Sequence, residues 1–124
     1  MLGNNEATAT IAVKDIGVAR KFYEDTLGLK PSKEIPSTLV YRSGISAILV
    51  YQSQYAGTNK ATAATWVVGN ELEAIVQTLK AKGVAFEHYD LPNTTRKDDV
   101  HVTGEMKAAW FRDPDGNILA IVNG

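Results

Sequence analysis

One strand–helix pattern occurs twice in this chain, at an offset of 55 residues. Residues 7–13 alternate small or polar side chains with apolar ones, as a half-buried strand does, and they lead into Asp15, an expected helix N-cap. An apolar stripe at helical spacing follows and ends at Gly28, where a C′ glycine belongs. The second half repeats these landmarks in register, at 63–68, Asn70 and Gly83. The repeat predicts a duplicated strand–helix unit.

Short strands are expected after each helix. In the first half the turn dipeptide Ser43-Gly44 separates two apolar runs, which predicts a hairpin. In the second half the turn formers of 113–117 separate two further strands. We therefore predict one α+β domain over residues 1–124, made of two βαβββ modules at about 1–60 and 61–124. The polar segment 90–106 has no counterpart in the first half, and it is expected to be either a lid, a binding loop or simply a mobile loop.

Composition excludes several function classes. The formal net charge is -1, and no stripe of Lys and Arg with interleaved aromatic residues occurs, so no nucleic-acid partner is expected. No apolar run approaches the roughly 20 residues that span a bilayer, so no membrane partner is expected. The chain has no cysteine, which excludes disulfides and thiolate metal sites. Residues 1–5 lack a signal-peptide pattern, and we predict a cytoplasmic protein.

Two segments carry a family resemblance. Residues 19–29 read Ala-Arg-Lys-Phe-Tyr-Glu-Asp-Thr-Leu-Gly-Leu, and residues 110–117 read Trp-Phe-Arg-Asp-Pro-Asp-Gly-Asn. In this order, and on two βαβββ modules, they resemble the vicinal-oxygen-chelate superfamily, which includes glyoxalase I, extradiol dioxygenases, fosfomycin-resistance transferases and bleomycin-resistance proteins. The resemblance implies a U-shaped cleft of mostly antiparallel sheet with helices outside, and it implies a homodimer.

The same resemblance places four metal-ligand positions on strands that line the cleft. Carried over to this sequence, they fall on Thr8, near Ile48, on Ala63 and on Ala120. Ile and Ala have no lone pair to donate, and Thr is a weak neutral ligand, whereas a divalent ion needs about three or four strong donors. We therefore expect no metal, no other cofactor, and no metal-dependent isomerase or dioxygenase chemistry.

Alternation along the strands predicts the lining of the cleft. If Thr8 faces the cleft, every second residue of the strand does so too, and the same rule applies to the other strands. A turn over 113–117 would put Trp110 in the cleft and a four-residue turn would put Phe111 there; the resemblance to the superfamily favours Trp110. Arg42 and Arg112 are expected to face outward. The predicted ligand-binding residues are Thr8, Thr10, Leu39, Tyr41, Ile48, Val50, Thr65, Trp110 and Ala120.

Such a lining is small, apolar and weakly polar, with two aromatic walls. It favours a metal-independent small-molecule-binding protein of the bleomycin-resistance type, which holds a hydrophobic or planar ligand such as an antibiotic or secondary metabolite. No catalytic residue is assigned. Two alternatives stay open: a metal-free lyase or isomerase-like enzyme, for which His101 is a candidate general base, and a regulatory or interaction module. An enzyme would show a titratable group with a perturbed pKa in the cleft.

Overall fold

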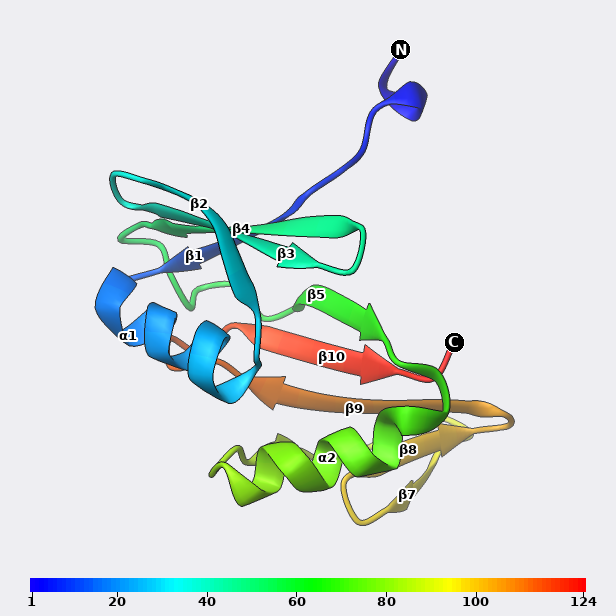
Figure 1. Ribbon diagram of the computed structural model, residues 1–124. Helices are drawn as coiled ribbons and strands as arrows, with labels where there is room; N and C mark the ends of the chain where they lie inside the picture. Colours follow the sequence, from blue (N-terminus) through cyan, green and yellow to red (C-terminus); the bar gives the residue numbers. More distant parts are fainter.

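A computed structural model describes residues 1–124 as a βαβββ module followed by a second module that adds two strands to the same pattern (Figure 1). The first contains β1 (Ala9–Val13), α1 (Ile16–Arg20), the π-helical segment η2 (Lys21–Thr26), β2 (Lys30–Ile35), β3 (Thr38–Ser43) and β4 (Ser46–Gln52). The second contains β5 (Thr62–Val67), the 3₁₀ turn η3 (Gly69–Glu71), α2 (Leu72–Ala81), β6 (Phe86–Glu87), β7 (Thr95–Lys97), β8 (Val100–Thr103), β9 (Met106–Arg112) and β10 (Ile118–Val122). The predicted α+β fold is confirmed.

The two modules use the same strand topology. In sheet order β1-β4-β3-β2 the first strand pairs in parallel with the last, and in β5-β10-β9-β8-β7 the first strand again pairs in parallel with β10. All other pairs are antiparallel, and β6 pairs with β9. The edge strands β1 and β5 lie against each other where the modules meet. A short N-terminal arm with the 3₁₀ turn η1 (Leu2–Asn4) projects from the body (Figure 1).

The helix ends agree with the repeat at three of its four landmarks. Asp15 caps α1, because its side chain accepts a hydrogen bond from the backbone N–H of Val18 at 3.1 Å. Gly28 and Gly83 follow the two helices with φ of 76° and 92°, a conformation that glycine adopts without steric cost. The prediction that Asn70 caps the second helix is wrong. It lies inside η3, so α2 starts later and makes no side-chain cap hydrogen bond.

Both modules contribute to one hydrophobic core. α1 and η2 pack between the sheets, where Phe22 lies 6.5 Å from Phe111 of β9, measured between ring centroids. The two sheets therefore share one set of apolar side chains on the faces that carry helices. No helix covers the opposite face of either sheet. The core consists of Ile11, Val13, Ala19, Tyr23, Leu39, Tyr41, Ile48, Val50, Leu72, Val76, Leu79, Val100, Ala109, Phe111, Leu119 and Ile121.

The segment that was expected to be a loop contains a hairpin. Strands β7 and β8 pair with each other, and His101 of β8 lies opposite Ala108 of β9. The hairpin thus extends the second sheet beyond β9 and carries a histidine onto it. The sequence did not indicate these strands. β7 is exposed along its whole length and consists of polar residues, so it lacks the apolar alternation of a half-buried strand. No helix of the structure is long and apolar enough to cross a membrane.

Candidate functional site

Four predicted ligand-binding residues lie in the core instead of the cleft. Parallel pairing of β1 with β4 places Ile48 opposite Ala9 and Val50 opposite Ile11, so both face α1. Tyr41 and Leu39 lie opposite these two residues in β3 and share their face. All four are 0–4% exposed. The predicted face is wrong because the sequence set the register of β4 by family analogy, and the real register differs by one residue.

The other five predicted residues avoid that core. Thr8, Thr10 and Thr65 are exposed on the helix-free side. Trp110 lies opposite Ala120, as predicted, while the neighbouring Phe111 enters the core. The structure thus brings Thr65, Ala120 and Trp110 together on one face across β5, β10 and β9.

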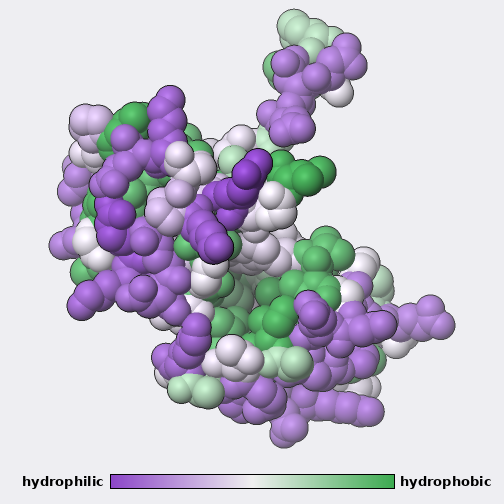
Figure 2. All heavy atoms as spheres, in the orientation of Figure 1, coloured by the Kyte–Doolittle hydropathy of each residue, from purple (hydrophilic) through white to green (hydrophobic).

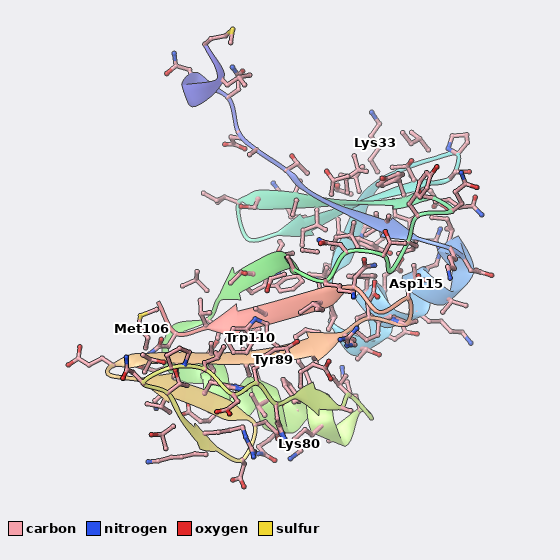
Figure 3. The ribbon with its side chains drawn as sticks, turned by 180° about the vertical axis from the view of Figure 1, so that it is seen from behind. Lys33, Lys80, Tyr89, Met106, Trp110 and Asp115 are labelled. Atoms are coloured by element: carbon pink, nitrogen blue, oxygen red, sulfur yellow. The ribbon has the colours of Figure 1, made fainter.

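Three aromatic rings cluster on that face of the second sheet. The indole of Trp110 makes edge contacts with Tyr89 and His101, at centroid distances of 5.3 and 4.9 Å. Its Nε1–H donates to the hydroxyl of Thr62 at 3.2 Å, which ties β9 to β5. Tyr89 and Trp110 lie next to each other in the view from behind (Figure 3). The sequence predicted a strand over residues 84–89, at whose end Tyr89 lies, but gave no reason to assign Tyr89 to the site. His101 was expected only as a loop residue.

Hydrogen bonding fixes the proton position on His101. Its Nε2 lies 2.9 Å from the backbone nitrogen of Tyr89, which can only donate, so Nε2 accepts and the neutral ring carries its proton on Nδ1. The ring is 2% exposed, and Nδ1 has no hydrogen-bond partner in the chain. The hydroxyl of Tyr89 is also buried and unpaired. Two polar atoms beside Trp110 therefore lack the partners that buried groups normally have.

Arg112 lies on the same face as Trp110, two residues further along β9. Its Nε donates to Glu87 at 2.5 Å, and its Nη1 donates to the carbonyl of Gly116 at 3.3 Å. The expectation that Arg112 faces outward is wrong, because alternate residues of a strand share a side. A groove of about 720 Å³ runs past these side chains, and it is lined by residues 57–61 of the linker and by Thr62, Tyr89, Leu91, Trp110, Arg112 and Ile118.

Tyr89 and Arg112, two ionisable side chains beside Trp110, have pKa values that are raised still further above 7. Burial, followed by the nearby charge of Glu87, raises the pKa of the Tyr89 phenol above its usual value. The hydrogen bond to Glu87 raises the pKa of the Arg112 guanidinium. At neutral pH the phenol is therefore a neutral donor, and the guanidinium is a permanent cation.

The helix-free face of the first sheet carries a second groove, of about 650 Å³. Thr8, Ser46 and Ala47 line it together with Arg42, which lies two residues from Val40 on the same side of β3. Arg42 is exposed, but it belongs to this face and not to a side remote from it. Apolar side chains also gather where the two modules meet on the side that carries α2 (Figure 2).

The positions expected from the resemblance to hold a metal do not match the donor set that a metal requires. Ile48 faces the core, and its neighbours on the bare face, Ala47 and Leu49, have no donor atoms either. Ala63 lies at an irregularity in the pairing of β5 with β10, and Ala120 is 2% exposed. No three His, Asp or Glu side chains of the chain come together closely enough to hold an ion.

Two modules with parallel edge strands and bare sheet faces define a glyoxalase-type protein. The family model described as Glyoxalase/Bleomycin resistance protein/Dioxygenase superfamily matches residues 7–121, and the chain belongs to that superfamily. The sequence matches no curated protein at a significant level.

Solved structures share the fold at low sequence identity. The fosfomycin resistance protein FosX from Listeria monocytogenes is 15% identical with a TM-score of 0.74, covering 97% of this chain and 93% of that one. Lactoylglutathione lyase from Agrobacterium tumefaciens is 16% identical with a TM-score of 0.72, covering 95% and 92%. An integron cassette protein from the Halifax Harbour sewage outfall metagenome is 15% identical with a TM-score of 0.71, covering 95% and 97%.

Proposed function

We propose that this protein binds a planar, hydrophobic small molecule without a metal ion, in the manner of a bleomycin-resistance protein. The observation that carries the proposal is the groove beside Trp110 and Tyr89, whose rings meet at 75° and offer both a flat surface and an edge. A stacked aromatic ligand gains roughly 0.5–1.5 kcal/mol per ring contact beyond the burial of its surface. Thr65 and Ala120 lie on the same sheet face as Trp110 but do not line this groove.

The pKa shifts of Tyr89 and Arg112 argue against acid–base catalysis by these two side chains. A general acid or base works best with a pKa near the operating pH. The shifts of Tyr89 and Arg112 both move away from neutrality, so neither group exchanges a proton at pH 7. This argues against the alternative of a metal-free lyase or isomerase in which one of these two residues transfers a proton.

The donor chemistry supports the metal-independent part of the proposal. One of the neighbouring FosX structures is a complex with Mn(II) and dihydroxypropylphosphonic acid. The corresponding positions expected in this chain, Thr8, Ala63 and Ala120, offer at most one neutral hydroxyl. Binding would therefore rest on stacking, burial and hydrogen bonds from the chain itself.

We further propose that the protein acts as a cytoplasmic homodimer. Exposed apolar residues lie at the edges of the bare sheet faces, among them Val67 at 71% and Ile45 at 97%. A second copy would cover such surface, and light scattering after size-exclusion chromatography measures the mass directly.

Fluorescence of a single tryptophan tests the binding proposal. Trp66 is replaced by Phe, so that Trp110 alone emits, and the variant is titrated with a panel of planar hydrophobic compounds. We expect saturable quenching or a spectral shift with at least one compound. Trp110→Phe, with Trp66 kept, is the matched control, and its signal should stay unchanged because Trp66 bonds Ser43 at the module interface. Absence of any response across the panel would refute the proposed function.

A further inference from the structure

The charged residues that line the groove beside Trp110 are all cationic. Its lining includes two cationic side chains, Arg112 and Lys60, and no acidic one. The groove on the first sheet differs, because Glu6 accompanies Arg42 there. The depression between α2 and β8 also differs, since Glu73, Asp98 and Asp99 line it together with two lysines. A cationic groove with aromatic walls is thus specific to the face that carries Trp110.

Two hydrogen-bond donors beside this groove have no acceptor in the chain. Nε and Nη1 of Arg112 are engaged by Glu87 and Gly116, which leaves Nη2 without a partner in the chain, and the side chain is 49% exposed. The Tyr89 hydroxyl is buried without a partner. Both groups are donors, and a guanidinium can only donate. Both donors therefore lack an acceptor on this face. Lys60, which pairs with no carboxylate, adds a positive charge that favours an anionic acceptor.

His101 holds Tyr89 in this position. Its Nε2 accepts the Tyr89 backbone N–H, while its ring packs edge-on against Trp110 at 83°. Trp110 is held in turn by Thr62. Tyr89 and Trp110 are consequently fixed on neighbouring segments, and Arg112 follows Trp110 on the same strand face.

We propose that the ligand of this groove is an aromatic acid, whose ring lies against Trp110 and whose carboxylate accepts hydrogen bonds from Arg112 and the Tyr89 hydroxyl. This inference rests on the proposed binding function and narrows its ligand class. Lys60 adds a longer-range attraction from the linker. His101 acts as a positioning residue, since it contacts the backbone of Tyr89 and not the ligand.

A matched pair of probes tests the inference. 2-Naphthoate and its methyl ester share the ring system and differ in the negative charge. Isothermal titration calorimetry at low ionic strength should give a dissociation constant for the acid at least about tenfold below that of the ester, the lower end of what a hydrogen bond to a charged group contributes. Added salt should weaken binding of the acid and leave the ester unaffected.

Single substitutions test each proposed ligand contact separately. Arg112→Gln should weaken naphthoate binding about tenfold and leave ester binding within about twofold. Tyr89→Phe should also weaken naphthoate binding about tenfold, since it removes one hydrogen-bond donor to the carboxylate. Arg96→Gln, on the exposed strand β7, is the control and should change neither. Lys60→Gln serves as a second cationic variant that leaves the Arg112–Glu87 pair intact.

The outcomes are distinct. Equal affinity for acid and ester would overturn this inference and leave the proposed binding function standing. Failure of both probes, together with the fluorescence panel, would overturn both. If Arg112→Gln impairs folding, judged from its thermal midpoint, then Lys60→Gln and Tyr89→Phe decide, and unchanged naphthoate affinity in both would overturn the inference.

Discussion

The hydroxyl of Tyr23 donates a hydrogen bond to the carboxylate of Asp113, 90 residues away in the sequence, at 2.7 Å. Tyr23 lies in η2 of the first module and Asp113 in the turn between β9 and β10 of the second. The carboxylate also accepts hydrogen bonds from the backbone and side-chain nitrogens of Asn117. This buried network joins one module to the turn that sets the register of Trp110.

Replacing Tyr23 with Phe should lower the free energy of unfolding by about 1.5–3 kcal/mol, the range for a hydrogen bond to a charged group. Burial and Asp113 raise the pKa of Tyr23, which therefore stays protonated as a donor. Urea denaturation measures the loss. Tyr41→Phe is the control, because its hydroxyl bonds the partly exposed Glu24 within the first module and water can replace it. An equal loss in both variants would contradict a special role for the contact between modules.

Gly57 should not tolerate a side chain. It has φ of 75°, and a Cβ built there would lie 2.0 Å from the carbonyl oxygen of Asp115. Gly57→Ala is therefore expected to destabilise by more than the roughly 1–2 kcal/mol of the left-handed conformation alone. Gly44→Ala isolates that conformational part, since Gly44 has φ of 59° with no atom within 4 Å. Thermal midpoints that fall equally in the two variants would show that the close approach is unimportant.

Asp99 should contribute to acid sensitivity. Its carboxylate contacts Lys80 at 2.7 Å and His88 at 2.8 Å, and these bonds lower its pKa, with Lys80 the larger cause. Because the folded-state pKa lies below the unfolded one, the stabilisation is present above about pH 4 and is lost as the pH falls through the folded-state value. Asp99→Asn should flatten this part of the pH profile of unfolding free energy, measured from pH 6 downward. An unchanged slope would contradict the assignment.

Divalent metals should leave the fold unaffected. A ligand that binds the native state raises its unfolding midpoint, so thermal unfolding with and without millimolar Mn²⁺, Ni²⁺ or Zn²⁺ reports on any native site. We expect no rise in the midpoint for any of the three ions. A reproducible rise, together with stoichiometric metal in the dialysed protein, would contradict the metal-independent proposal.

The fold was predictable because its signals are local. The landmarks at Asp15, Gly28 and Gly83 depend on backbone conformation at one residue, and the pairing of Trp110 with Ala120 depends on the length of one turn. Register between distant strands is not local. Ile48 was assigned to the wrong face because nothing near β4 in the sequence indicates that it pairs with Ala9.

By itself the sequence determined the duplicated modules, the superfamily and the absence of donor side chains at the expected metal positions, since each follows from the residues present and their spacing. Tertiary structure alone decided the composition of the candidate site. Tyr89, His101 and Arg112 come from three separate segments, and only the β7–β8 hairpin and the pairing of β6 and β8 with β9 bring them to Trp110. Residues that come together from separate strands have no regular spacing in the sequence, so no sequence pattern indicates such a cluster.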